Sequence, residues 1–227
     1  MTFWNIEKGD IMKLEIKDYT KVIRGNTVLD HINLTFSGGK IYGLKGINGS
    51  GKTMLMRAVC GLILPTHGSV VIDGKTLGKE LSFPESAGVL IENPSFLPNL
   101  TGIRNLKILA DLQGGVTEEQ IRSVLTTVGL DPDDRRKFRK YSLGMKQKLG
   151  IAAAILGDPE LIILDEPLNA LDTDGVEMVH TVLAQAKARG ALIILACHDA
   201  EELNALSDEI ITIESGKITN ISAVEGA

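Results

Sequence analysis

The sequence predicts an α/β fold built on a mostly parallel sheet, and three observations lead to this prediction. Two short apolar segments, 161–165 (LIILD) and 191–197 (ALIILAC), bracket a segment of helical period at 174–189. Strand, helix and strand at this spacing are typical of a parallel sheet whose strands are buried on both faces. A glycine-rich turn at 46–53 separates an apolar strand from a helix, and residues 99–157 have a helical apolar period.

Strand-like segments dominate the first part of the chain. They are 14–23 (LEIKDYTKVI), 27–36 (TVLDHINLTF), 40–46 (KIYGLKG) and 68–77 (GSVVIDGKTL), with turn signals between them. Short strands joined by such turns predict a small, mostly antiparallel sheet laid over the core. Residues 1–11 precede the first strand, and we expect them to be an N-terminal tail or extension.

Helices are expected after the glycine-rich turn and in the middle of the chain. The segment 51–62 (GKTMLMRAVCGL) should form a helix that stops near Gly61, and Thr117 with the Glu119-Gln120 pair is a capping signal for another. We predict one domain from 12 to 220 with an inserted helical subdomain at about 92–157. Residues 221–227 are expected to be a C-terminal tail.

The composition excludes several classes of protein. A chain of 227 residues with 44% hydrophobic and 23% charged residues can bury one large core or two smaller ones. The net charge of −5 argues against a nucleic-acid partner. Cys60 and Cys197 lie in separate apolar stretches, as expected for buried thiols in a reducing compartment. The apolar runs fall short of the roughly 18 residues of a membrane span. We therefore expect a cytoplasmic chain that meets a membrane only through a partner.

The segment 46–53 (GINGSGKT) matches the pattern G-x-x-x-x-G-K-[ST] in the required context between a strand and a helix. Its glycines let successive backbone N–H groups converge on a phosphate, at which the following helix also points its positive end. Lys52 adds a charge for the β- and γ-phosphates, and Thr53 offers a hydroxyl to Mg²⁺. The alternative is a glycine-rich turn with a chance lysine, and both flanking elements argue against it.

Asp165 and Glu166 end the apolar run LIIL, where an unpaired charge is costly. Asp165 can present its carboxylate to the Mg²⁺ held by Thr53, directly or through water. Glu166 is displaced by one residue and can face an attacking water as general base. A surface strand-end cap is the structural alternative. These features leave metabolite kinases, GTPases and motor ATPases open.

Further motifs narrow the class. Lys52 and Asp165 are 113 positions apart, and the segment 141–147 (YSLGMKQ) lies between them. This segment resembles the LSGGQ signature of the ATP-binding cassette (ABC) family. The segment 169–172 (NALD) resembles the D-loop of that family, and His198 resembles its switch histidine. The resemblance covers the chain from Leu14 to about Gly216.

The resemblance implies a P-loop nucleotide-binding core with a mostly parallel sheet, a small antiparallel β subdomain and an inserted helical subdomain. It implies an ATPase in which Ser142 and the N–H groups near Gly144 bind the γ-phosphate of ATP held by the opposite subunit of a head-to-tail dimer. His198 would reach the same phosphate, and Asp172 would link the two sites. ATP would contact the loop and first helical turn, namely Asn48, Gly49, Ser50, Gly51, Lys52, Thr53 and Met54.

The chain departs from the family pattern at several positions. Ile23 falls where an aromatic residue usually stacks on adenine, with Tyr19 four residues upstream. Glu92 occupies the position of the Q-loop glutamine, from which a carboxylate can meet Mg²⁺ through water. Leu143 and Met145 replace a glycine and the glutamine of the signature. The pattern LIExP with YSLGMKQ resembles the exporter branch that includes bacitracin and lantibiotic self-protection proteins.

We therefore expect an ATP-hydrolysing subunit that closes as a homodimer, or with a closely related cassette, and drives a separate integral-membrane permease. The exported compound would be a peptide, antibiotic or similar molecule, and the chain would sit on the inner face of the membrane. The segment 94–102 (PSFLPNLTG) is either core packing or the groove for a permease helix. The basic run at 133–141 is either a solvated face or a region that attracts the partner's nucleotide or the inner membrane surface. The alternative functions are a soluble ABC-type switch without a permease and a metabolite kinase.

Overall fold

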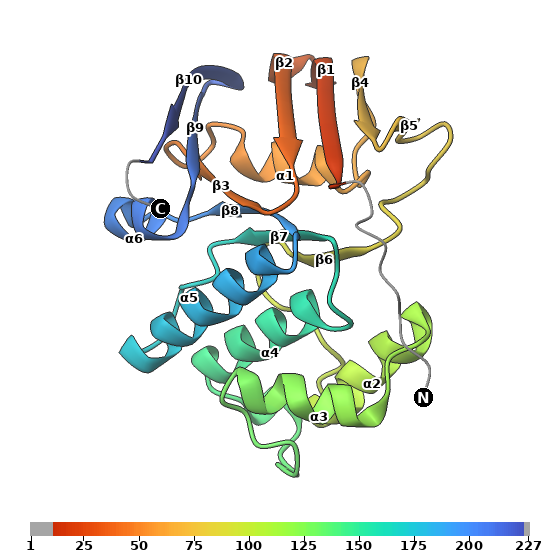
Figure 1. The fold of residues 1–227 in the computed structure, drawn as a ribbon, viewed down its shortest axis with the longest axis vertical. Helices are drawn as coiled ribbons and strands as arrows, with labels where there is room; N and C mark the ends of the chain where they lie inside the picture. The colour runs from red at the N-terminus through yellow and green to blue at the C-terminus, as the bar shows by residue number, and fades with distance from the viewer. Residues whose placement is uncertain (1–10, 225–227) are drawn as a thin grey trace.

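The computed structural model describes residues 11–224, so nearly all of the expected N-terminal tail lies outside the described residues. The described chain forms two sheets and a group of helices (Figure 1). The larger sheet has six strands in the order β10-β9-β3-β8-β7-β6. Their bounds, in that order, are Lys217–Ala223, Glu209–Glu214, Lys40–Lys45, Leu192–Ala196, Leu161–Asp165 and Ala87–Leu90.

The larger sheet is parallel except for β10. Strands β9, β3, β8, β7 and β6 pair in parallel, whereas β10 pairs antiparallel with β9. Every residue of β7 and β8 is buried, as the continuous apolar runs predict for strands covered on both faces. The carboxyl ends of β3, β7 and β8 therefore meet at one edge, where the chain leaves each strand for a loop.

The smaller sheet is antiparallel, in the order β2-β1-β4-β5. Its strands are β2 at Asn26–Ser37, β1 at Lys13–Ile23, β4 at His67–Ile72 and β5 at Lys75–Thr76. Buried side chains of this sheet pack with helix α1 (Lys52–Val59) against the larger sheet, and Leu14, Tyr19 and Phe36 are fully buried there. The predicted antiparallel sheet over the core is confirmed.

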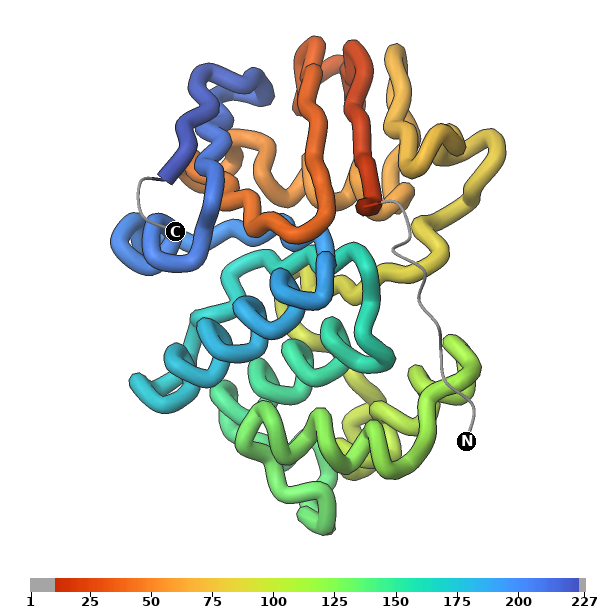
Figure 2. Tube along the Cα trace, viewed as in Figure 1, coloured from red at the N-terminus to blue at the C-terminus, as the bar shows by residue number. Residues whose placement is uncertain are grey.

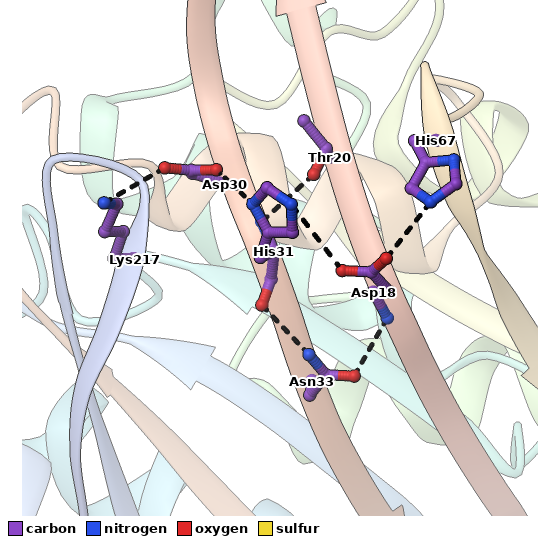
Figure 3. A network of polar contacts seen from close by, with 7 residues as sticks. All are labelled: Asp18, Thr20, Asp30, His31, Asn33, His67 and Lys217. Carbon is purple, nitrogen blue, oxygen red and sulfur yellow. Dashed lines mark hydrogen bonds and ion pairs between the residues drawn. The ribbon is translucent and has the colours of Figure 1, made fainter.

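The outer part of this sheet carries a polar network that joins its strands (Figure 3). Asp18 and His31 both have positive φ, at 47° and 52°, and the side-chain amide of Asn33 bridges the backbone of the two residues. The Asp18 carboxylate lies 3.1 Å from His67 Nε2 and 4.0 Å from His31 Nε2. Asp30 accepts from His31 and pairs with Lys217, which ties β10 to β2.

The helices between β6 and β7 form the end of the molecule farthest from the tips of β1 and β2 (Figure 2). They are α2 at Gly102–Gln113, α3 at Glu118–Thr127, the 3₁₀ turn η1 at Phe138–Lys140 and α4 at Leu143–Ile155. Thr117 and Gln120 form the predicted capping box of α3. Helix α5 (Thr173–Ala188) joins β7 to β8, and the short α6 (Ala200–Leu206) follows β8.

Four elements were not predicted, namely β6, α6, β9 and β10. Ser215 and Gly216, with φ of 49° and 78°, form the turn between β9 and β10, and this Ser-Gly pair is a hairpin signal that the prediction missed. The pairing of β10 with β9 runs through Ala223. Residues 221–223 therefore belong to a strand and not to the predicted C-terminal tail. No helix of residues 11–224 is long and apolar enough to cross a membrane.

Candidate nucleotide-binding and catalytic site

The glycine-rich loop connects β3 to α1 and is shaped by its glycines. Gly49 and Gly51 have φ of 79° and 116°, a conformation that favours glycine. A Cβ on Gly46 would lie 2.5 Å from Ser50 Oγ, so a side chain there would collide with the loop. The loop leads directly into the N-terminus of α1, which begins at Lys52. The free backbone N–H groups of a helix N-terminus attract anions.

Lys52 is folded back onto this loop. Its Nζ donates hydrogen bonds to the carbonyl oxygens of Gly46 at 2.6 Å and Ile47 at 3.2 Å, and the residue is buried. These two contacts give the buried ammonium group hydrogen-bond partners, although within residues 11–224 no carboxylate forms an ion pair with it. A phosphate placed on the loop would offer Lys52 a stronger, charge-assisted partner.

Asp165 lies at the end of β7 and faces the first turn of α1. The hydroxyl of Thr53 donates to Asp165 Oδ2 at 2.7 Å, across 112 residues of sequence. Burial raises the pKa of Asp165, while the Thr53 hydrogen bond acts in the opposite direction. A hydroxyl and a carboxylate thus converge at a point where a cation would offset the cost of burying the charge.

Glu166 follows with a positive φ of 53°, and its N–H donates to the carbonyl of Ala196 in β8. This uncommon conformation turns its side chain toward His198. Glu166 Oε2 accepts from His198 N at 3.1 Å and lies 2.8 Å from His198 Nδ1. The two residues predicted to be catalytic are therefore in direct contact, at the ends of neighbouring parallel strands.

Gln147 completes this region and was not predicted as a site residue. It lies on α4, is buried, and its Nε2 donates to the carbonyl oxygens of Glu166 at 3.0 Å and Pro167 at 3.1 Å. The amide therefore fixes the backbone that carries Glu166. The signal in the sequence was a glutamine on the buried, otherwise apolar face of this helix, because a buried polar group needs a hydrogen-bond partner.

These groups border a cavity of about 500 Å³. The predicted residues that line it are Asn48, Gly49, Gly51, Lys52, Thr53, Met54, Glu92, Asp165 and Glu166. Ser50 is buried beneath the loop instead. Further lining residues, which the sequence did not single out, are Thr27, Val28, Asn93, Gln147, Asn169, Ser215 and Gly216. The cavity is large enough for a small-molecule ligand.

Ile23 is not among the residues that line this cavity, and its contact with adenine stays a prediction. It pairs with Asn26 at the tip of the β1–β2 hairpin, so the strand that borders the cavity presents Thr27 and Val28. None of the residues that line the cavity in the described chain is aromatic. A purine held there would meet aliphatic and hydroxyl groups rather than a stacked ring.

Glu92 is engaged by a neighbour. It has a positive φ of 62°, and its Oε1 lies 2.6 Å from Arg57 Nη2 on α1. The negative charge that the sequence places near the phosphates is therefore offset by a guanidinium in this conformation. Release of Glu92 from Arg57 would be needed before its carboxylate could meet a metal.

Ser142 and Gly144 of the signature segment, and Asp172 of the D-loop segment, lie apart from this cavity. Ser142, Gly144 and Asp172 line a second cavity of about 420 Å³, and the two sets of lining residues have no member in common. Ser142 caps α4 by accepting from Met145 N at 3.2 Å, and Asp172 caps α5 by accepting from Gly175 N at 3.0 Å. Within one chain, Ser142 therefore does not face the phosphate loop.

The sequence profile of the family described as "ABC transporter" matches residues 29–169. That range holds the phosphate loop, the signature segment and the Asp165-Glu166 pair. The chain belongs to the ABC transporter family. It is an ATP-binding cassette, the ATPase subunit of such a transporter.

Curated relatives agree with this assignment. An uncharacterized ABC transporter ATP-binding protein, YybJ of Bacillus subtilis, is 46% identical over 205 residues, covering 90% of this chain and 94% of the relative. The bacitracin transport ATP-binding protein BcrA of Enterococcus faecalis is 41% identical over 90% of this chain and 67% of its own length. The lantibiotic transport ATP-binding protein SrtF of Streptococcus pyogenes is 36% identical over 90% of this chain and 88% of its own. The resemblance to the bacitracin and lantibiotic branch is confirmed.

A solved structure shares the fold. It is the dimeric, post-hydrolysis state of the ATP-binding cassette MJ0796 bound to ADP and Pi. Its TM-score is 0.84, with 22% sequence identity over 94% of this chain and 100% of that chain. The likeness confirms the predicted α/β cassette architecture.

Proposed function

We propose that two copies of this chain close head to tail around two ATP molecules, and that hydrolysis reopens them. The observation behind this proposal is the division of the site between two cavities. Lys52, Thr53 and Glu166 surround the larger one, whereas Ser142 lies on the other. In a head-to-tail dimer, Ser142 and the start of α4 of one copy meet the terminal phosphate that is held at Lys52 of the other.

Mg²⁺ fits the residues beside the phosphate loop. Thr53 and Asp165 offer hard oxygen donors that are already 2.7 Å apart. Asp165 is buried, and among residues 11–224 no cationic side chain forms an ion pair with it. Thr53 and Asp165 would hold the ion, with Glu92 acting through water. When bound, Mg²⁺ neutralises charge on the β- and γ-phosphates.

The chain's own residues perform the remaining work. Lys52 exchanges the Gly46 and Ile47 carbonyls for phosphate oxygens, which preserves its buried charge in a hydrogen-bonded environment. Glu166 accepts a proton from the attacking water, and His198 moves from Glu166 to the γ-phosphate. Gln147 keeps the Glu166 backbone in place during this exchange.

The proposed partner is an integral-membrane permease that exports a peptide, antibiotic or similar compound. The printed names of BcrA and SrtF, both transport ATP-binding proteins for such compounds, support this class of cargo. In segment 94–102, Phe96 packs against Phe138 with ring centroids 5.2 Å apart, whereas Leu97 is 53% exposed. A partly buried and an exposed apolar side chain side by side suit a surface that receives a permease helix, and such a contact would hold the cassette on the inner face of the membrane.

The substitution Glu166→Gln tests the catalytic part of the proposal. The change keeps an oxygen acceptor for His198 N but removes the base, so we expect turnover to fall at least ~10²-fold. ATP should still bind and should trap a dimer, detectable by size-exclusion chromatography with ATP. Glu177→Gln is the matched control, because Glu177 is exposed on α5 away from the cavity. Unchanged turnover in Glu166→Gln would remove Glu166 from this role.

A second experiment separates the transporter subunit from a soluble switch without a permease. The cassette is co-expressed with a membrane protein encoded next to it and purified in detergent. Copurification and acceleration of ATP hydrolysis by the exported compound are expected. A cassette that hydrolyses ATP at an unchanged rate and never associates with such a protein would favour the soluble switch.

A further inference from the structure

A third donor atom lies beside the catalytic pair. Within residues 11–224, Glu166, Cys197 and His198 bring a carboxylate oxygen, a thiol sulfur and an imidazole nitrogen within 4.8 Å of one another. Cys197 follows β8 directly, so its position is fixed by the buried end of a central strand. His198 is exposed and Glu166 half-buried, so the cluster reaches the surface through these two residues, whereas Cys197 is buried behind them.

The surroundings of Cys197 are negative. Burial raises the pKa of its thiol, a hydrogen bond from the Asp199 backbone acts in the opposite direction, and the charges of Glu166, Asp199 and Glu202 raise it further. An anionic thiolate is disfavoured by these carboxylates, but a thiolate that binds a divalent cation is not, because the cation reverses the local charge. The same carboxylates attract a cation to the open face of the cluster.

The donor set is unlike the one proposed for Mg²⁺. Mg²⁺ takes oxygen ligands, whereas Zn²⁺ combines sulfur, nitrogen and oxygen with bond lengths of about 2.0–2.3 Å. Around a tetrahedral ion of that size, donor atoms lie about 3.3–3.8 Å apart. The distance between Glu166 Oε2 and His198 Nδ1, now 2.8 Å, would have to increase slightly. Cys197 Sγ, which lies within 4.8 Å of the other two ligand atoms, would have to move closer to them.

We propose that Glu166, Cys197 and His198 form a binding site for a borderline-soft divalent cation such as Zn²⁺, and that a cation bound there stops ATP hydrolysis. Binding forms a Zn–S bond and releases the Cys197 proton to solvent. Glu166 then donates its lone pair to the metal and cannot accept a proton from water. His198 is held beside Glu166 and cannot reach a phosphate. The inhibitory part rests on the proposed role of Glu166, whereas the binding part does not.

The test measures zinc binding and hydrolysis separately. Zinc is titrated into nucleotide-free protein against a chromophoric zinc indicator, for the wild type, Cys197→Ala and Cys60→Ala. Cys60 is the matched control, because it is equally buried but lies at the end of α1 away from the cluster. We expect one site per chain whose affinity falls at least ~10-fold in Cys197→Ala and is unchanged in Cys60→Ala.

All three chains also carry His31→Ala and His67→Ala, and the chain with these two changes alone serves as the wild type, because those imidazoles face Asp18 on the outer sheet and could bind zinc independently (Figure 3). With excess Mg-ATP, Cys197→Ala should hydrolyse ATP and require at least ~10-fold more Zn²⁺ for half-inhibition. Cobalt should produce a thiolate charge-transfer band that is absent from Cys197→Ala.

Equal zinc affinity in the wild type and Cys197→Ala would overturn the site. Cysteine-dependent zinc binding that leaves hydrolysis untouched would overturn the inhibitory role. A wild type that binds zinc through Cys197 but does not hydrolyse ATP would refute the proposed catalytic function and leave the zinc site standing.

Discussion

Gln147 is the residue whose replacement most directly tests how the catalytic backbone is held. In Gln147→Met the side chain keeps a similar length but loses the amide that donates to the Glu166 and Pro167 carbonyls. Each hydrogen bond contributes about 1 kcal/mol net, so the free energy of unfolding should fall by about 2 kcal/mol. For a chain of this size, 1 kcal/mol corresponds to about 2–4 °C, and the midpoint of thermal unfolding should fall by about 4–8 °C.

The assay is thermal unfolding of the nucleotide-free chain, followed by circular dichroism. Gln185→Met provides the matched control, since Gln185 is exposed on α5 and the same chemical change there should cost less than about 0.5 kcal/mol. Because Gln147 positions the backbone of Glu166, kcat should also decrease while the KM for ATP changes little. A Gln147→Met chain that melts within 1 °C of the control, roughly the shift of a surface substitution, would refute the reasoning.

Two further predictions concern the interior. In Gly88→Ala, the new Cβ on β6 would overlap the carbonyl oxygen of Ala154 on α4. We therefore expect the free energy of unfolding, measured by thermal unfolding, to fall by at least about 2 kcal/mol. An unchanged midpoint would mean that the two elements are not this close. The Cys197→Ala chain retains one thiol, Cys60, and burial raises the pKa of that thiol to about 12. A thiol reagent at pH 8 should therefore modify Cys60 only after denaturation. Rapid modification of the native chain would contradict its burial.

The sequence predicted best those features that local rules determine. The phosphate loop needs glycines at positive φ between a strand and a helix, and GINGSGKT satisfies this within eight residues. Asp165 was predictable because a buried apolar strand must end where its charged residue can find a partner. That partner, Thr53, lies 112 residues away, but the loop motif already fixed its position.

Other features of the site depend on how distant segments pack. Ile23 was assigned by counting along the chain, whereas the residues that reach the cavity depend on how the β1–β2 hairpin sits on the loop, and they are Thr27 and Val28. The pairing of Glu92 with Arg57 joins a loop to a helix 35 residues away. No periodic pattern encodes either arrangement.

Three active groups of the described site contact other parts of the same chain. Lys52 is held by loop carbonyls, Thr53 by Asp165, and Glu166 by His198. In the proposed cycle, ATP and Mg²⁺ would therefore take over contacts that these groups now make within the chain, and each hydrogen bond would be replaced by a stronger contact to phosphate or metal. His198 alone gains its new partner only when a γ-phosphate is present. The contact between Glu166 and His198 therefore makes release of the general base depend on the arrival of the trinucleotide, and this dependence gives a physical reason why hydrolysis should follow ATP binding and closure rather than precede them.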